Sequence, residues 1–333
     1  MRTLFVSVLV ALFVLGACTS SQSSSEKIDY TQLVNPFIGT DFTGNTYPGA
    51  QAPFGMVQLS PDNGLAGWDR ISGYFYPDST IAGFSHTHLS GTGAGDLYDI
   101  LFMPVTLPYK EAKGELGIHS KFSHNDEEAS AGYYRVKLQD YNINVELTAT
   151  PRCGVQRYTF PKAESMVILN LKKAMNWDFT MDSHIEVVDS CNIRGYRFSE
   201  GWARGQKVYF ATRFSRPFKS MELDNAEIKL KGEKVGTSNI ARFMFDTEEG
   251  EQITVVTALS GVSVEGAVKN LDAEAPHNDF DKYLAAAKAD WNKQLQRIQV
   301  VGGEADDQVN FYTALYHSMI APTIYSDVDG KYY

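Results

Sequence analysis

Two histidines, His86 and His88, stand two residues apart in the segment FSHTHLSGTG. Alternate residues of a strand face the same side, so both imidazoles could reach one ligand. Hydrogen bonds to sugar hydroxyls, or support of the loop itself, fit such a pair. A zinc site would need at least a third ligand. Either role would depend on pH, because the ordinary pKa of imidazole lies close to neutrality.

A second motif, Asp-Val-Asp-Gly, contains Asp327 and Asp329. Its spacing is typical of the opening of a calcium-binding loop. A carboxylate can also accept two hydrogen bonds from neighbouring sugar hydroxyls. The third interpretation is a turn or a helix cap.

Residues 35–95 form a segment rich in glycine, aromatic side chains, amides and hydroxyls, with eleven of the chain's 27 glycines. Long ordered loops are uncommon unless they line a site. Glycine lets the backbone approach a ligand closely, and an aromatic face suits a sugar ring. The structural alternative is a string of tight turns between strands.

Four residues of this segment are candidates for sugar binding. Trp68 follows Gly67 and is either a platform for a sugar or a plug of the core. Asp69 could contact a hydroxyl or pair with a neighbouring arginine at the surface. Gly39 and Thr40 could offer backbone amides to a sugar hydroxyl.

The N-terminus predicts the compartment. Residues 4–17 are an apolar run too short to span a bilayer, which is typical of a signal peptide. The run ends in LGAC, which resembles the lipobox of bacterial lipoproteins, so residues 1–17 would be removed and Cys18 would carry the lipid. Residues 18–27 would be a flexible tether. We expect a protein of the bacterial cell envelope that meets the membrane only through this anchor; an ordinary secretory signal is the alternative.

The composition excludes some classes of partner. The formal net charge is −10 and no basic patch is present, which argues against nucleic acid. The two other cysteines, Cys153 and Cys191, match no metal motif. An oxidising compartment would permit a disulfide between them, and two unpaired thiols are the alternative.

The elements that must position these residues are mainly strands. Short β-branched or aromatic runs separated by turn residues predict a β-sandwich over residues 28–275. The runs are 133–138, 143–150, 166–171, 183–188, 207–214, 241–245 and 253–259. Apolar side chains at helical spacing predict amphipathic helices over 279–298 and 306–320, with a short strand and turn at 298–304. A helix after a complete β-domain has nothing to pack its second face on, so we expect a further domain beyond residue 333.

Long motifs resemble the bacterial α-mannosidases of glycoside hydrolase family 92. The matching stretches are NPFIGT (35–40), GNTYPGA (44–50), APFGMVQLSPD (52–62), IAGFSHTHLSGTG (81–93), FYTALYH (311–317) and SDVDG (326–330). The resemblance covers nearly all of the chain after the signal peptide.

The resemblance implies an N-terminal β-sandwich, a helical linker at 276–303, and the start of an (α/α)₆ barrel at 304–333. It implies calcium-dependent, inverting removal of terminal α-linked mannose from glycans, with most calcium ligands in the barrel. The general acid and base would also lie in the barrel, so no catalytic residue is expected in this chain. Asp329 would contact the terminal mannose.

The alternative function is a carbohydrate-binding or adhesive β-sandwich lipoprotein without catalysis. The amphipathic helices near the C-terminus favour the enzyme, because a finished binding module does not need them. A metal-dependent amidohydrolase is disfavoured, because its barrel would need repeated βα units after the histidine pair.

Overall fold

The structure, a computed structural model, describes residues 28–112, 117–172 and 176–333. The predicted signal peptide, Cys18 and the tether lie outside the described residues. Within the described residues, no helix has the length and apolar character needed to cross a bilayer.

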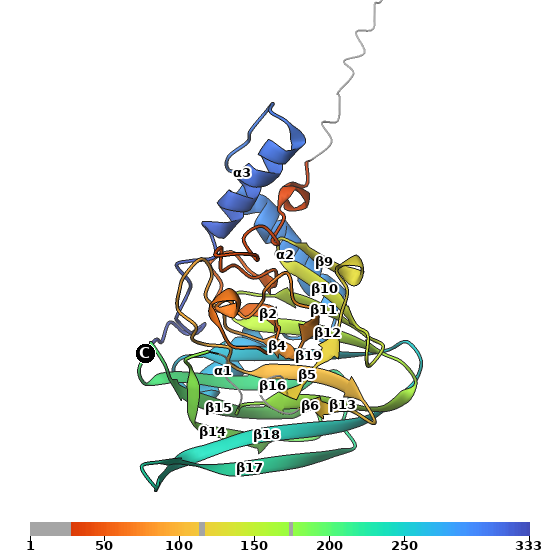
Figure 1. Cartoon of the computed structure of the whole chain (residues 1–333), viewed down its shortest axis with the longest axis vertical. Helices are drawn as coiled ribbons and strands as arrows, with labels where there is room; N and C mark the ends of the chain where they lie inside the picture. The colour runs from red at the N-terminus through yellow and green to blue at the C-terminus, as the bar shows by residue number, and fades with distance from the viewer. Residues whose placement is uncertain (1–27, 113–116, 173–175) are drawn as a thin grey trace, which may run out of the picture.

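Two antiparallel sheets form most of the fold, as the strand pattern predicts (Figure 1). In spatial order, the first sheet contains β1 (Ala50–Gln51), β2 (Gln58–Asp62), β4 (Gly83–Ser85), β5 (Leu101–Thr106), β13 (Ala163–Asn170), β18 (Glu233–Thr247) and β17 (Ser220–Leu230). The second contains β14 (Phe179–Val187), β15 (Asn192–Glu200), β16 (Gln206–Phe214), β19 (Glu251–Ser260), β12 (Cys153–Phe160), β11 (Ile143–Ala149), β10 (Tyr133–Leu138) and β9 (Glu127–Ser130).

Short elements decorate the sandwich. Two small ribbons pair β3 (Thr80–Ile81) with β8 (Ser120–Lys121), and β6 (Glu111–Ala112) with β7 (Gly117–Ile118). The 3₁₀ helices are η1 (Tyr30–Leu33), η2 (Trp68–Arg70) and η3 (His124–Asp126). The predicted strand at 298–304 is wrong: these residues form a turn and an extended loop, and Val301 is almost fully exposed. Without a neighbouring strand, this short apolar run has no ladder to join.

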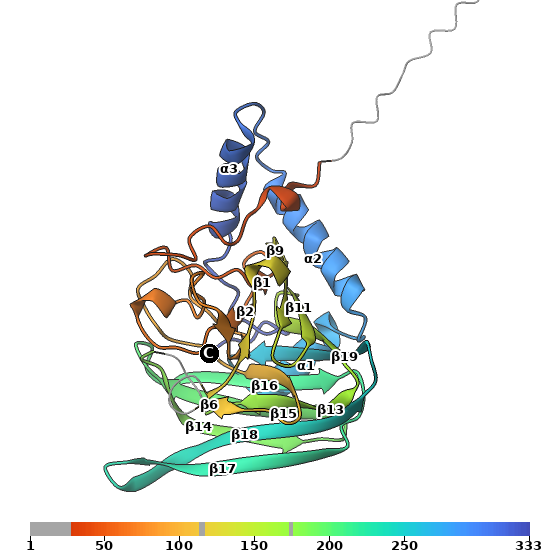
Figure 2. The same ribbon diagram turned by 45° about the vertical axis from the view of Figure 1, so that its right-hand side comes forward.

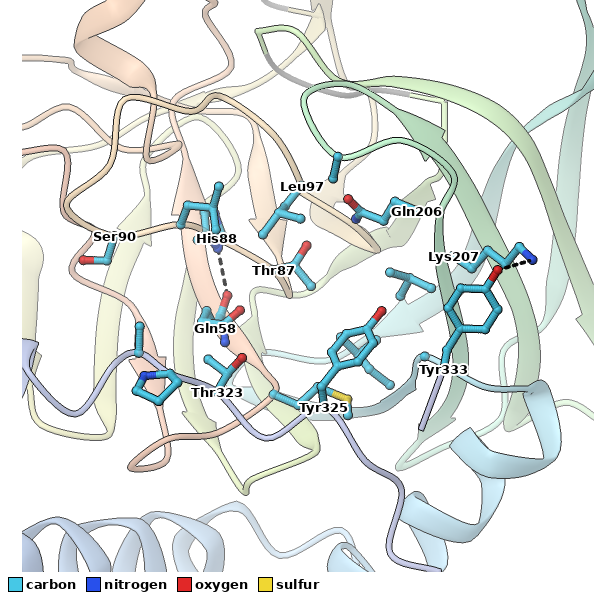
Figure 3. Close-up of a pocket in the computed structure, with 18 of the residues that line it drawn as sticks. Gln58, Thr87, His88, Ser90, Leu97, Gln206, Lys207, Thr323, Tyr325 and Tyr333 are labelled. Atoms are coloured by element: carbon cyan, nitrogen blue, oxygen red, sulfur yellow. Dashed lines mark hydrogen bonds between the residues drawn. The ribbon is translucent and has the colours of Figure 1, made fainter. Parts of the chain in front are cut away.

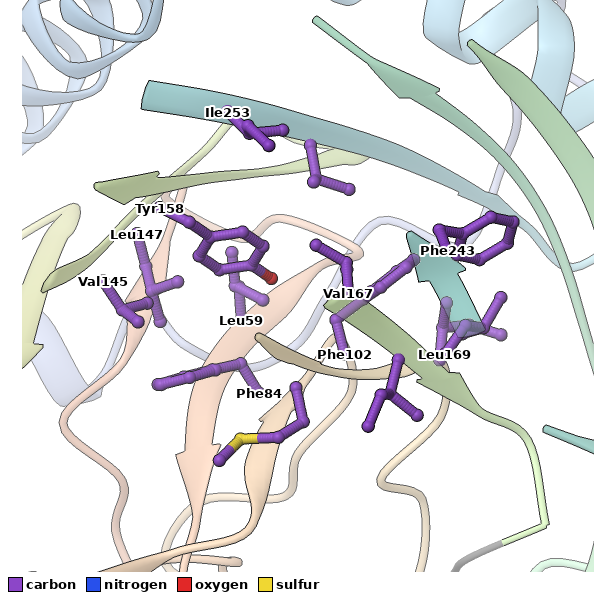
Figure 4. Close-up of a cluster of buried hydrophobic side chains, with 14 of the residues drawn as sticks. Leu59, Phe84, Phe102, Val145, Leu147, Tyr158, Val167, Leu169, Phe243 and Ile253 are labelled. Atoms are coloured by element: carbon purple, nitrogen blue, oxygen red, sulfur yellow. The ribbon is translucent and has the colours of Figure 1, made fainter. Parts of the chain in front are cut away.

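The main core lies between the sheets (Figure 4). Phe84, Phe102 and Val167 come from the first sheet and meet Val145 and Tyr158 of the second. The alternating strands β10 and β11 bury one face and expose the other.

The strand β19 is buried along nearly its whole length. Helix α1 (Val264–Glu274) covers the outer face of its sheet, where Ala267 and Leu271 pack on Val256 and Ala258. Burial on both faces explains why the strand is a continuous apolar run. This helix was not predicted from the sequence, although Val264, Ala267, Val268 and Leu271 stand at helical spacing after the N-cap Ser263.

Helices α2 (Phe280–Leu295) and α3 (Ala305–His317) stand at one end of the sandwich (Figure 2). Their predicted inward stripes are confirmed except for Ile298, which is about half exposed. Trp291 of α2 and Tyr312 and Tyr316 of α3 share a second core with the N-terminal Tyr30. The helices are therefore packed on the N-terminal segment of the sandwich domain.

Candidate active site

A cavity of about 720 Å³ opens where the loop after β4, the β15–β16 hairpin and the C-terminal segment meet (Figure 3). This volume is typical of small-ligand sites. The lining includes the polar or aromatic side chains of Gln58, Thr87, His88, Ser90, Thr92, Arg204, Gln206, Lys207, Ser260, Thr323, Tyr325 and Tyr333. Sequence analysis predicted only His88 of this set. The lining thus combines apolar walls with amide, hydroxyl and ammonium groups.

His88 is held rigidly at the cavity wall. Its Nδ1 lies 2.8 Å from the carbonyl oxygen of Gln58, and its Nε2 lies 2.9 Å from Asp62 Oδ1. Ser85 Oγ also lies 3.2 Å from Nε2, so both ring nitrogens are engaged within the domain. Since neither nitrogen is left to bind a metal, we assign His88 the role of shaping the wall.

His86 does not share a ligand with His88. It is fully buried, its Nδ1 lies 2.7 Å from the carbonyl oxygen of Ile100, and its ring packs on Phe102. The strand β4 ends at Ser85, so the alternation that would align the two histidines does not extend to them. Burial lowers the pKa of His86 from 6.5 to about 4. We assign it to the core as a neutral imidazole.

This burial predicts a pH-dependent stability. An unfolded His86 would take up a proton near pH 6.5, whereas the folded one resists protonation down to about pH 4. The stability that depends on neutral His86 is thus complete above pH 6.5 and is lost as the pH falls towards 4. Between pH 7.5 and 4.5, we expect the free energy of unfolding to fall by about 2 kcal/mol more in the parent than in His86→Asn.

Asparagine keeps a donor for the Ile100 carbonyl and does not titrate. Urea denaturation of the parent and of His86→Asn at each pH therefore gives, by difference, the contribution of His86 protonation to the free energy of unfolding. Parallel pH profiles for the two proteins would show that His86 is readily protonated in the folded state.

A buried ion cluster lies directly behind the cavity. Arg197 Nη1 lies 2.5 Å from Asp99 Oδ1 and 3.1 Å from Asp178 Oδ2, and all three side chains are buried. The other oxygen of Asp99 accepts hydrogen bonds from Gln206 Nε2 at 2.8 Å and Thr87 Oγ1 at 2.7 Å. The cluster therefore fixes two polar side chains of the cavity from behind. Burial raises the pKa of Asp178 to about 6, although Arg197 acts in the opposite direction.

Sequence analysis missed this cluster, although the sequence carries a signal for it. Arg197 is in phase with the inward residues Ile193, Gly195 and Ser199 of β15. A buried arginine needs a carboxylate partner, so this position predicts an ion pair. The partner's identity could not be predicted, because Asp99 lies in the loop before β5, far away in the chain.

Asp327 and Asp329 have different surroundings. Asp327 is buried and accepts hydrogen bonds from Ser260 Oγ and Asn270 Nδ2, both at 2.8 Å. It therefore anchors the C-terminal segment to β19 and α1. Asp329 is exposed, and its Oδ2 lies 2.8 Å from Lys269 Nζ, an interaction that lowers the pKa of this carboxyl.

Trp68 is a surface residue and not a core plug, with 68% of its side chain exposed. Asp69 beside it is also exposed, while Arg70 pairs with Asp78 instead. Thr40 is buried, and its backbone amide already donates to the carbonyl of Phe37 at 3.1 Å. The amide of Thr40 is thus engaged within the loop, and Gly39 sits in the same turn at a φ of 89°.

The described residues contain no group of three or more histidine, cysteine, aspartate or glutamate side chains suited to a metal ion. Cys153 and Cys191 are both free thiols, and burial raises the pKa of Cys153 well above its usual range. Within this part of the chain the two cysteines do not form a disulfide.

Comparison with known proteins identifies the family. Residues 33–260 match the glycosyl hydrolase family 92 N-terminal domain, and residues 266–333 match the glycosyl hydrolase family 92 catalytic domain. A secreted glycosidase of Arthroderma benhamiae, described as uncharacterized, is 25% identical over 351 residues, covering 95% of this chain and 44% of the relative.

Solved structures agree. A family GH92 α-mannosidase from Bacteroides thetaiotaomicron, determined in complex with mannoimidazole, superposes with a TM-score of 0.83 and 35% identity, covering 92% of this chain and 42% of that one. A family GH92 inverting mannosidase from the same organism gives a TM-score of 0.77 and 27% identity, covering 93% and 42%. The chain thus spans less than half the length of these relatives. The extent of the N-terminal match shows that the chain belongs to glycosyl hydrolase family 92.

Proposed function

We propose that this chain forms the N-terminal part of a calcium-dependent, inverting exo-α-mannosidase that removes terminal mannose from glycans. The observation that carries the proposal is the likeness to solved α-mannosidases over more than nine tenths of the chain. The hydroxyl-binding character of the cavity supports a sugar as ligand.

The chemistry requires groups that the cavity does not supply. Inverting hydrolysis uses a carboxylic acid to protonate the leaving oxygen and a carboxylate to activate water, roughly 6.5–9.5 Å apart. Among the described residues that line the cavity, there is no aspartate or glutamate. We propose that the acid and base come from a part of the family's catalytic domain that this chain, less than half the length of its relatives, does not span. The calcium ligands would lie there too.

The role of this chain is to bind and orient the terminal sugar. Gln206 and Thr87 are held by Asp99, so their polar atoms are fixed before a ligand arrives. Asp329, Trp68 and Asp69 are exposed, so a sugar at the edge of the domain could reach them, with Asp329 exchanging its pair with Lys269 for sugar hydroxyls. A carboxylate such as Asp329 can hold two neighbouring hydroxyls.

In the whole enzyme, Asp329→Ala should lower kcat/KM on an aryl α-mannoside by at least about tenfold, because a charged acceptor is lost from the bound sugar. The melting temperature should hardly change, since Lys269 and Asp329 form an exposed pair. The matched control is Asp246→Ala, which removes an exposed aspartate of β18 that is paired with Lys219. It should leave both quantities unchanged. Parental kcat/KM in Asp329→Ala would show that this aspartate serves only the surface pair.

A further inference from the structure

Three of the chain's four tryptophans form a contiguous exposed surface. The side chains of Trp68, Trp177 and Trp202 are 68%, 38% and 71% exposed. The ring centroids of Trp68 and Trp177 lie 5.2 Å apart, and those of Trp177 and Trp202 lie 6.2 Å apart. We call these three residues the tryptophan patch. Large aromatic side chains gathered in water usually mark a binding surface.

Hydrogen bonds hold the three loops of the patch in place. Asn176 Oδ1 accepts from the amide of Gly67 at 2.6 Å, which ties the loop of Trp68 to that of Trp177. The amide of Trp177 donates to the carbonyl of Gly95 at 3.2 Å. The next residue, the buried Asp96, accepts from the amide of Ala203 at 2.7 Å beside Trp202. The stretch 95–96 therefore fixes two of the three loops, so the patch is preorganised.

The patch adjoins the cavity through the same loops. Residues 203–208 line the cavity directly after Trp202, and Ser90, Thr92 and Leu97 line it from the loop that carries Gly95. A Cβ added to Gly93 would lie 3.6 Å from the ring of Trp68. A ligand that fills the cavity can thus continue over the tryptophans without leaving the surface.

We propose that Trp177 and Trp202 extend the sugar site and bind the units of the glycan that follow its terminal residue. This inference rests on the proposed function for the identity of the sugar. The ligand class is a neutral oligosaccharide, because pyranose rings present C–H faces that pack on the faces of aromatic rings. The exposed carboxylate of Asp69 beside Trp68 can accept hydrogen bonds from hydroxyls at the same surface.

The test is a titration of the full chain with α-mannotriose and with free mannose, followed by intrinsic fluorescence. The emission reports on the patch, because the fourth tryptophan, Trp291, is fully buried elsewhere. We expect a saturable change with mannotriose and a Kd at least about tenfold lower than for mannose. Trp177→Ala and Trp202→Ala should each weaken mannotriose binding by about tenfold, as expected for truncation of aromatic anchors.

The control Leu230→Ala removes an exposed apolar side chain from the edge strand β17 and should leave the Kd unchanged. Equal affinity for mannose and mannotriose, or mannotriose binding that survives both tryptophan substitutions in a folded chain, would overturn the proposal. If the patch instead packs against another protein segment, mannotriose binding should survive both tryptophan substitutions.

Two outcomes separate this inference from the proposed function. Tryptophan-dependent binding of maltotriose without binding of mannotriose would support the patch and contradict the mannosidase assignment. The whole enzyme could instead release mannose while Trp177→Ala and Trp202→Ala leave the affinity for mannotriose unchanged. That result would overturn the role of the tryptophan patch but not the proposed function.

Discussion

Replacing Arg197 by methionine is expected to lower the free energy of unfolding by about 3–5 kcal/mol. The side chain is fully buried between Asp99 and Asp178, so its removal leaves two carboxylates without a countercharge. Urea denaturation at pH 7 measures the effect. The ligand affinity of the cavity should fall as well, because Gln206 and Thr87 are positioned through Asp99.

The companion variant Asp178→Asn should change stability much less, because Arg197 keeps its ion pair with Asp99 and because burial, which raises the pKa of Asp178 to about 6, makes its charged form costly. The sign of its pH dependence is opposite to that of His86. The folded state binds the proton of Asp178 more tightly, so this group makes stability fall as the pH rises from about 4 to 6. An Arg197→Met protein within 1 kcal/mol of the parent would show that the cluster does not hold charges in the folded state.

Trp291→Ala should have an effect of similar size, about 3–5 kcal/mol, because it empties the centre of the second core. The indole is fully buried, its Nε1 donates to the carbonyl of Gln51 at 2.6 Å, and its ring lies 4.6 Å from that of Tyr316. Gly132, at a φ of 80°, leaves the space that the indole fills. One side chain thus joins α2 to the sandwich and to α3.

Trp291→Phe keeps an aromatic ring but loses the bond to Gln51 and part of the packed volume; we therefore expect a loss smaller than that of Trp291→Ala. Hydrogen exchange at the amides of α3 should accelerate in Trp291→Ala before the sandwich strands open. Unchanged exchange in α3 would mean that the helix is held by other contacts.

The strands whose alternation is regular could be predicted from the sequence. The β10 prediction matches the observed bounds, and β11 and β16 match to within one residue. The edge strand β17 was missed because its alternation changes phase near Asn225, so that charged residues fall on both faces. Helix α1 was missed although the spacing of Val264, Ala267, Val268 and Leu271 is helical, because the whole stretch up to residue 275 was assigned to the β-sandwich.

The site was harder to predict than the fold. The glycine-rich segment was expected either to line a site or to form tight turns, and its residues Gln58, Thr87 and His88 line the cavity. The metal-like spacing of His86 and His88 had no such meaning, because one ring turns into the core. The tryptophan patch and the Arg197 cluster are assembled from loops and strands far apart in sequence, so only the folded chain brings their members together.

The central claim is that this chain supplies the sugar-binding wall of an exo-α-mannosidase. Its most direct test is to incubate α-mannotriose with two proteins, the whole enzyme and residues 18–333 alone. Each incubation is carried out with and without a calcium chelator. We predict that the whole protein releases single mannose units from the non-reducing end in a chelator-sensitive manner and that residues 18–333 release none. Release of mannose by residues 18–333 alone, or no hydrolysis of any α-mannoside by the folded whole protein, would contradict the claim.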